Sequence, residues 1–441
     1  MSAATVPAPQ IAHSTREMAL AAKQASRKLA LLDAAARNKA LEAMAMALEG
    51  AGAEILAANA EDVKSADSLA PATLARLKLN PAKLREMVEQ VRSVAALHDP
   101  LGRTLDAVEL DEGLDMQKVS VPLGVLAVIF EARPDAVTQI AALAIKSGNT
   151  VILKPGSEVE RTATALVGAL RSALVREGLP QDAILLLPGR ERVPELLAAH
   201  GLVDLVIPRG GKALVEYVQA NTRIPVLGHT EGICHIYVDR AADEDLALRV
   251  IDDAKTDYPA ACNAVETVLV HCEIAAEFLP KLADRLRSRG VRIHTTDAAG
   301  AFFYGNDPRV ADWHTEYGDL AISIGVVDSL DAAIEHIHAH GSLHTESVIT
   351  EDAGIAERFL REVDAASLMH NASTRFADGF RYGFGAEVGI STSKFHARGP
   401  VGLEGLTTYK YLVRGHGHIA GDYRGAKARA FTHRRSAQAR G

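Results

Sequence analysis

The chain has 441 residues, more than one hydrophobic core normally serves, so two or more domains are expected. Its 48% of hydrophobic and 24% of charged residues are typical of a globular protein and exclude bulk disorder. The formal net charge of −8 argues against a nucleic-acid-binding surface, which needs Lys and Arg clustered over a broad face.

The three cysteines, Cys234, Cys262 and Cys272, are odd in number and have no C-x-x-C spacing. Neither a disulfide framework nor a zinc site is therefore expected, and the pattern fits a reducing cytoplasm. Residues 1–12 lack the features of a signal peptide, and no stretch approaches the ~20 apolar residues of a membrane span. We therefore predict a cytoplasmic protein without membrane contact.

Residues 14–97 are predicted to be mostly helical. Ser14 and Glu17 have the spacing of a capping box, and Ala/Leu-rich segments follow. Residues 104–121 then alternate polar and apolar positions around Glu112 and Gly113, which predicts a β-hairpin with its turn at these two residues.

The next part of the chain alternates apolar runs with helical patterns. The runs lie at residues 125–130, 151–153, 183–187, 203–207 and 225–227. Pro134 opens one helix, and Ser157 with Glu160 predicts a capping box for the next. This alternation predicts a parallel sheet covered by helices, as in a doubly wound dinucleotide-binding domain. No G-x-G-x-x-G fingerprint follows the first strand, so a standard Rossmann phosphate loop is not predicted.

Two loops of this region carry candidate cofactor contacts. Lys154 and Ser157 lie where a strand ends and a helix begins, a place that offers N–H groups and positive charge to a phosphate. The alternative is that Ser157 only caps its helix. A second loop allows close backbone approach and supplies two cations, through Arg209, Gly210, Gly211 and Lys212. A plain turn is the alternative there.

Cys262 is the candidate nucleophile. It lies in the irregular segment 255–264, where Pro259 cannot donate a backbone hydrogen bond, so a bent loop with exposed N–H groups is predicted. Such a loop can hold a thiolate and an oxyanion, and a thiolate attacks acyl carbons well. The alternative is a buried cysteine that acts as a small hydrophobic residue.

After Cys262 a second α/β alternation is predicted. Its strands are expected near 267–270, 291–293, 321–327, 345–350 and 366–369, and its helices near 274–288, 330–340 and 353–363. Residues 406–413 read as a further strand. The basic residues 424–441 are expected to form a solvated, flexible tail.

Residues 258–267, Tyr-Pro-Ala-Ala-Cys-Asn-Ala-Val-Glu-Thr, resemble the nucleophile segment of the aldehyde dehydrogenase superfamily. Within that superfamily, their sequence is most similar to that of the gamma-glutamyl phosphate reductase family. Arg133 stands where hydrolytic members have an oxyanion-binding asparagine. The water-activating glutamate of those members has no clear counterpart in residues 227–232, where Glu231 stays unassigned. Both differences favour reduction of an acyl phosphate over hydrolysis of a thioester.

The resemblance implies roles for further residues. Glu316 lies in a segment similar to the one that holds the nicotinamide ribose, and the alternative is a surface glutamate after Trp313. The resemblance also implies a set of side chains for carboxylate or phosphate binding, namely Asn371, Ser373, Thr374 and Arg375. Asn263 and Arg133, together with backbone N–H groups, are expected to stabilise the oxyanion. The alternative is that Arg133 and Arg375 only form salt bridges to nearby acids such as Glu131 or Asp378.

An aldehyde-dehydrogenase-like α/β fold with a Rossmann-type cofactor domain is thus expected. Its predicted parts are a cofactor domain (1–105 and 122–257), a catalytic domain (258–398), oligomerisation strands (106–121 and 406–423) and the tail. The resemblance implies NADPH-dependent reduction of L-glutamyl 5-phosphate to L-glutamate 5-semialdehyde through a Cys262 thioester, in proline biosynthesis. It also implies a homo-oligomer, and glutamate kinase as the upstream enzyme that supplies the labile acyl phosphate.

Two alternatives stay open. One is an NAD(P)-dependent aldehyde dehydrogenase that hydrolyses its thioester. The other belongs to a different class: a non-catalytic dinucleotide-binding or scaffold protein.

Overall fold

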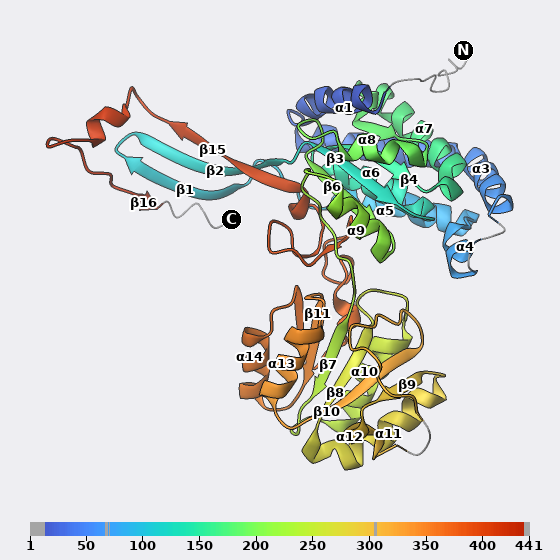
Figure 1. Cartoon of the computed structure of the whole chain (residues 1–441). Helices are drawn as coiled ribbons and strands as arrows, with labels where there is room; N and C mark the ends of the chain where they lie inside the picture. The colour runs from blue at the N-terminus through green and yellow to red at the C-terminus, as the bar shows by residue number, and fades with distance from the viewer. Residues whose placement is uncertain (1–13, 67–68, 70, 304–306, 436–441) are drawn as a thin grey trace.

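The computed structural model describes residues 14–66, 69, 71–303 and 307–435. Figure 1 shows two α/β bodies, one above the other, and a long antiparallel arm that extends sideways from the first body. Each body contains a parallel sheet with helices on both faces. Within the described ranges, no helix has the length and apolar character needed to cross a membrane.

The first body holds a four-stranded parallel sheet in the order β5-β4-β3-β6. Its strands are β3 (Val125–Phe130), β4 (Thr150–Pro155), β5 (Ile184–Leu186) and β6 (Leu205–Arg209). Its helices are α1 (Thr15–Leu29), α2 (Ala34–Gly50), α3 (Gly52–Lys64), α4 (Pro71–Leu77), α5 (Pro81–Ala96), α6 (Pro134–Lys146), α7 (Glu160–Arg176), α8 (Val193–Leu197) and α9 (Lys212–Ala220). The predicted capping box of Ser14 and Glu17 is confirmed at the start of α1.

Strand β3 shows why this sheet is buried on both sides. Leu126, Val128 and Phe130 belong to one hydrophobic cluster, whereas Val125 and Ala127 belong to the cluster on the opposite face. Successive side chains of a strand point to opposite faces, so a continuous apolar run needs two covered faces.

The second body holds a six-stranded parallel sheet in the order β12-β11-β7-β8-β10-β9. Its strands are β7 (Cys234–Val238), β8 (Val265–His271), β9 (Arg292–Thr295), β10 (Ala321–Val327), β11 (Thr345–Ile349) and β12 (Ser367–His370). Its helices are α10 (Glu244–Thr256), α11 (Cys272–Ser288), α12 (Asp297–Gly300), α13 (Leu330–His340) and α14 (Ala353–Glu362).

The arm is an antiparallel sheet in the order β15-β2-β1-β16. Strands β1 (Thr104–Asp111) and β2 (Leu114–Pro122) form the predicted hairpin, with Glu112 and Gly113 at the turn. Strand β15 (Thr407–Arg414) pairs with β2, and β16 (Arg434–Arg435) pairs with β1.

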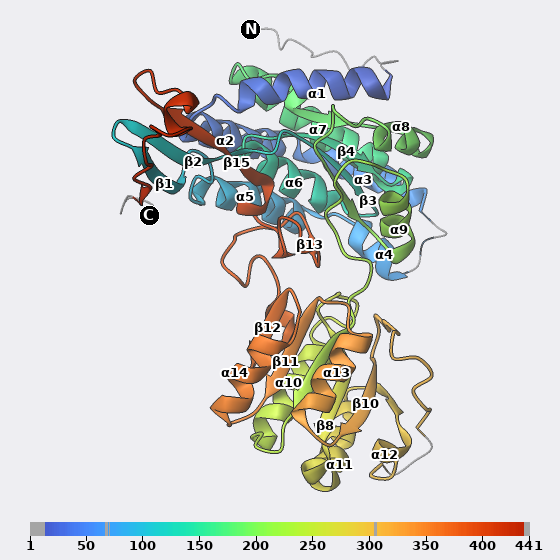
Figure 2. The ribbon, with the colours of Figure 1, turned by 60° about the vertical axis from the view of Figure 1, so that its left-hand side comes forward.

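The division of the chain differs from the predicted one at two places. Strand β7 and helix α10 lie in the second body, because Ile236 and Ile251 pack in its core, so the first body ends before residue 234 rather than at 257. After β12 the chain returns to the first body, where Ala386 and Val388 join the core beneath β3. Figure 2 shows this returning segment with β13 (Ile390–Ser391) close to the first body; β13 pairs with β14 (Gly399–Pro400).

Three local predictions also need correction. Residues 225–227 form only an isolated bridge through Val226, not a strand. Ser157 caps no helix: residues Ser157–Val159 form a short 3-10 turn, and α7 begins at Glu160 without a side-chain cap. Residues 424–435 are exposed but attached to the arm, through β16 and an ion pair from Arg429 to Asp111 at 2.6 Å. The rest of the predicted tail, residues 436–441, lies outside the described residues.

Candidate active site

Cys262 lies in the bend between α10 and β8. Turns of the backbone shape this bend, with Ala261 N donating to Tyr258 O and Ala264 N donating to Ala261 O. The Cys262 side chain is half-buried. Gly232 packs so closely against it that a Cβ there would lie 2.6 Å from Cys262 Cα, so only glycine fits. The backbone of residues 232 and 262 is thereby held together.

Two histidines stand beside this cysteine. Cys262 Sγ and one ring nitrogen each of His229 and His344 lie within 4.8 Å of one another. The two imidazole rings contact each other edge to face, with centroids 4.9 Å apart. Since burial lowers the pKa of His229, its ring is held neutral and can accept the proton of a thiol.

Sequence reasoning did not find this pair. His344 was not singled out, and a catalytic role for His229, in residues 227–232, was left open. Cys262, His229 and His344 each precede a strand of the second sheet, and β8, β7 and β11 are adjacent in that sheet. Residues before adjacent parallel strands meet at one edge, so the strand order was the signal that the sequence lacked.

Arg133 and Arg209 lie at the carboxyl ends of adjacent strands of the first body. Arg209 ends β6, and Arg133 follows β3 and precedes α6. The charges of Arg133, Glu387 and Cys262 all act on Arg209, so this guanidinium lies within electrostatic reach of the thiol. Burial and the like charge of Arg133 lower the pKa of Arg209. Among the described residues, neither guanidinium has a salt bridge within 4 Å, although the charge of Glu387 acts on Arg209.

Arg375 and Asn263 are already engaged within the protein. Arg375 Nε lies 3.1 Å from Asp257 Oδ2, and its Nη1 donates to Asn263 Oδ1. Asn263 Nδ2 donates to Ala377 O at 3.0 Å. Arg381 and Arg375 together lower the pKa of Asp257, which stays ionised. These contacts hold the two ends of the Cys262 segment to residues 374–377, so both side chains position the loop.

The other expected substrate contacts differ in their freedom to bind. Asn371 adopts a left-handed φ of 52°, and its Oδ1 accepts from Thr350 N at 3.0 Å, so it is committed to the end of β11. Ser373 Oγ accepts from Arg375 N at 3.3 Å and caps a short 3-10 turn. Thr374 Oγ1 is buried without a hydrogen-bond partner among the described residues.

The loop after β4 keeps one cation and one hydroxyl at the carboxyl end of the sheet. Lys154 is buried, and its Nζ donates to Pro155 O. Burial lowers the pKa of Lys154. Ser157 is exposed. Glu158 Oε1 accepts from Ala132 N at 2.6 Å, which ties the ends of β3 and β4 together, and its charge acts on Lys154.

The loop after β6 has its donors occupied. Gly211 N donates to Glu131 Oε2 at 3.1 Å, so a carboxylate already lies at the N-terminus of α9. Lys212 forms an ion pair with Glu231, which raises the pKa of Lys212. Gly210 packs against the Glu131 carboxylate as well, because a Cβ there would lie 2.6 Å from its Oε2.

Glu316 is exposed, and its charge acts on Lys212, His229 and Glu266. Its carboxylate is therefore within electrostatic reach of His229, one of the two histidines beside Cys262. The backbone after it is anchored, because Gly318 N donates to Glu266 Oε1 at 3.3 Å.

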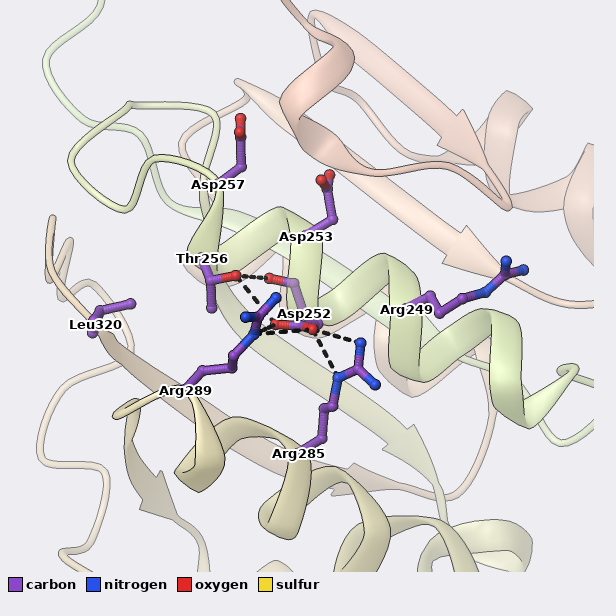
Figure 3. Close-up of a pocket in the computed structure, with 8 residues that line it drawn as sticks. All are labelled: Arg249, Asp252, Asp253, Thr256, Asp257, Arg285, Arg289 and Leu320. Carbon is purple, nitrogen blue, oxygen red and sulfur yellow. Dashed lines mark hydrogen bonds and ion pairs between the residues drawn. The ribbon is translucent and has the colours of Figure 1, made fainter.

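A polar cavity of about 570 Å³ lies beneath the C-terminal half of α10. Figure 3 shows Asp252 between Arg285 and Arg289, with Asp257 at the edge. Asp252 pairs with the two arginines at 2.7 and 3.0 Å, so its charge is balanced. Cys262 does not line this cavity, which adjoins the helix leading to the thiol.

Comparison with known proteins shows which family the chain belongs to. The sequence model described as "Aldehyde dehydrogenase family" matches residues 3–300. The gamma-glutamyl phosphate reductase of Synechococcus sp. (strain JA-2-3B'a(2-13)) is 54% identical over 94% of this chain and 92% of its own. That of Natronomonas pharaonis is 51% identical over 94% and 96%. The chain belongs to the gamma-glutamyl phosphate reductases of the aldehyde dehydrogenase family.

The fold of this family is confirmed by a solved structure. The crystal structure of gamma-glutamyl phosphate reductase from Thermotoga maritima superimposes with a TM-score of 0.90 at 40% identity, over 92% of this chain and all of the other. The family resemblance drawn from residues 258–267 and the aldehyde-dehydrogenase-like α/β fold are both confirmed.

Proposed function

We propose that this protein reduces L-glutamyl 5-phosphate to L-glutamate 5-semialdehyde with release of phosphate, an oxidoreductase step of proline biosynthesis, and uses NADPH. The observation that carries the proposal is one thiol with two histidines beside it and the charge of Arg209 acting on it, while Arg133 acts on Arg209. A thiol suits covalent acyl transfer, and the arginines suit an acyl phosphate. The names of the relatives supply the substrate.

In the first step the Cys262 thiol loses its proton to a neighbouring imidazole and attacks the acyl carbon. His229 is suited to take the proton, because its Nδ1 donates to Ile390 O at 2.9 Å and its Nε2 keeps the lone pair. The C–O bond to phosphate breaks with both electrons going to the phosphate oxygen, which takes up one proton from solvent, so that phosphate leaves as the dianion. Arg133 and Arg209 hold the leaving phosphate and stabilise its charge.

The residual acyl group stays on Cys262 as a thioester. Backbone N–H groups of the bend and one of the arginines stabilise the oxyanion that forms on reduction. The imidazole returns its proton to the sulfur as the aldehyde departs, which regenerates the thiol. When bound, NADPH supplies the hydride that this reduction consumes.

Lys154, Ser157 and Glu316 are the residues proposed to hold the cofactor. Lys154 and Ser157 fit a dinucleotide, because they lie at the carboxyl end of a parallel sheet, where a cation and an exposed hydroxyl meet. The loop 209–212 fits it less well, since Glu131 takes the Gly211 N–H and Glu231 neutralises Lys212. Within that loop we assign Arg209 to the substrate instead.

Reduction is favoured over thioester hydrolysis by the state of Glu231. This carboxylate, the nearest in sequence to the water-activating glutamate of hydrolytic members, is ion-paired with Lys212. It is therefore unsuited to abstract a proton from water. A non-catalytic scaffold is disfavoured by the two histidines beside Cys262 and by the charge of Arg209 that acts on it.

We also propose a homo-oligomer in the cytoplasm that receives its labile substrate from glutamate kinase. The arm supports the first part, because strand β15 ends its sheet and exposes Tyr409, Tyr411 and Val413. An edge strand with exposed apolar side chains is suited to pair with a second copy. The three free cysteines support a reducing compartment.

The reverse reaction tests the proposal. Glutamate 5-semialdehyde and NADP should give NADPH absorbance that depends on added phosphate. A hydrolytic aldehyde dehydrogenase would give sustained absorbance without phosphate, and a scaffold would give none. Either outcome would contradict the proposed reaction.

A further inference from the structure

The cysteine and the two histidines of the site also form a set of metal-type ligands. Their three ligand atoms lie within 4.8 Å of one another and come from segments far apart in the sequence. We propose that Cys262, His229 and His344 bind one zinc ion, and that this ion inhibits the enzyme reversibly. The spacing of cysteines along the chain predicted no zinc site, because two of these ligands are histidines brought in by the fold.

The histidines are oriented as metal ligands are. His229 Nδ1 lies 2.9 Å from Ile390 O and must donate to it, since a carbonyl only accepts. This contact fixes the tautomer and leaves the Nε2 lone pair free. Metal-binding histidines almost always have such a partner on the other ring nitrogen.

His344 carries the strongest sign of a missing partner. The side chain is fully buried, and its Nδ1 lies 2.8 Å from Thr345 Oγ1. Its Nε2 is buried without a hydrogen bond to any described residue. Buried polar atoms are seldom left unpaired, and in the tautomer whose Nδ1–H donates to Thr345 Oγ1 a bound cation would satisfy the Nε2 lone pair.

The donor set selects the metal. One thiolate and two imidazoles suit zinc, whereas calcium and magnesium need oxygen ligands. Zinc bonds of ~2.0–2.3 Å require ligand atoms about 3.5 Å apart, so the side chains must close by about 1 Å. A water molecule completes the tetrahedron.

Binding is a simple exchange at the thiol. The Cys262 proton is released to solvent, a sulfur–zinc bond forms, and no electron is transferred. The positive charge of Arg209 acts on the same thiol and disfavours a further cation, which keeps the binding reversible. A thiolate bound to zinc cannot attack an acyl carbon. The inhibition therefore rests on the proposed role of Cys262, but the metal binding does not.

Cobalt, as a coloured stand-in for zinc, tests the site in the reduced whole protein. We expect one Co²⁺ per chain with a thiolate-to-metal absorption band, displaced by Zn²⁺. His229→Gln and His344→Gln should each weaken binding by at least ~10-fold. Cys272→Ser is the matched control, since Cys272 is an exposed thiol beside His271, and it should bind as the wild type does.

Two results would overturn the site: no thiolate band in the wild type, or unchanged affinity in both histidine variants that melt like the wild type. Zn²⁺ should also remove activity in parallel with binding, and a chelator should restore it. Activity that survives full occupancy would overturn the inhibition. Turnover by Cys262→Ser would instead defeat the proposed function and leave the histidine dependence of metal binding as a separate result.

Discussion

Lys255 Nζ lies 2.9 Å from Glu266 Oε2, and both side chains are completely buried. Lys255 also donates to Asp319 O at 3.2 Å. The pair thus joins the last turn of α10, which leads to Cys262, to β8 and to the segment after Glu316. Burial raises the pKa of Glu266 to about 7, whereas the facing ammonium opposes that shift.

Removing one partner of this pair should destabilise the fold strongly. Lys255→Met leaves an uncompensated carboxyl in the core and should cost ~3–5 kcal/mol in the free energy of unfolding. The double variant with Glu266→Gln should recover part of that loss, because no unpaired charge remains. Urea unfolding of the three variants measures the coupling, and additive losses would show that the two groups do not interact.

Arg133 and Arg209 should control phosphate binding. Arg209→Ala should raise the KM for phosphate in the reverse reaction by ~10–100-fold. This factor corresponds to the loss of one hydrogen bond to a charged group, which contributes ~1.5–3 kcal/mol. Arg133→Ala should act in the same direction. Arg85→Ala, an exposed arginine of α5, is the control and should leave kinetics unchanged. If Arg209→Ala and Arg133→Ala had the same KM for phosphate as the Arg85→Ala control, the phosphate would bind elsewhere.

Arg375 should act through the Cys262 segment and not by touching substrate. Because Arg375 pairs with Asp257, Arg375→Lys and Asp257→Asn should lower kcat by similar factors with little change in KM. Steady-state kinetics of the double variant should show a non-additive loss. A rise in KM confined to Arg375→Lys would restore the direct substrate role expected from the sequence.

His336, whose ring packs edge to face against Trp313, should make the free energy of unfolding depend on pH. Burial and neighbouring histidines lower the pKa of His336 to about 3, below its ordinary value of 6.5. The unfolded chain therefore binds the proton first as the pH falls, so stability is full above pH 6.5 and declines from there towards pH 3. His336→Phe keeps a ring against Trp313 and should reduce the fall of Tm between these pH values. If the Tm of His336→Phe fell as much as that of the wild type, the pH dependence would come from other titratable groups.

Sequence patterns predicted the regular elements well, because each depends on neighbouring residues. The hairpin turn at Glu112 and Gly113 and the strands after Cys262 are examples. The predicted boundary at 257 was wrong, since only the packing of β7 shows which sheet it joins.

Site residues were predicted only where a single segment of the sequence was enough to identify them. Cys262 was found from its loop, but His344 could not be found without the order of β11, β7 and β8. Arg375 was predicted to bind substrate, with a salt bridge to a nearby acid as the alternative; its actual partner, Asp257, is remote in the sequence and could not be recognised from it.

The central claim is that Cys262 carries the acyl group, and a burst experiment without phosphate tests it most directly. With glutamate 5-semialdehyde and NADP, the wild type should form one NADPH per active site and then stop, because no phosphate releases the thioester. Mass spectrometry should find the acyl group on the Cys262 peptide, and added phosphate should restart turnover. Cys262→Ala should give no burst, whereas Cys272→Ala should behave as the wild type. A full burst in Cys262→Ala, or an unmodified Cys262 after a wild-type burst, would contradict the covalent mechanism.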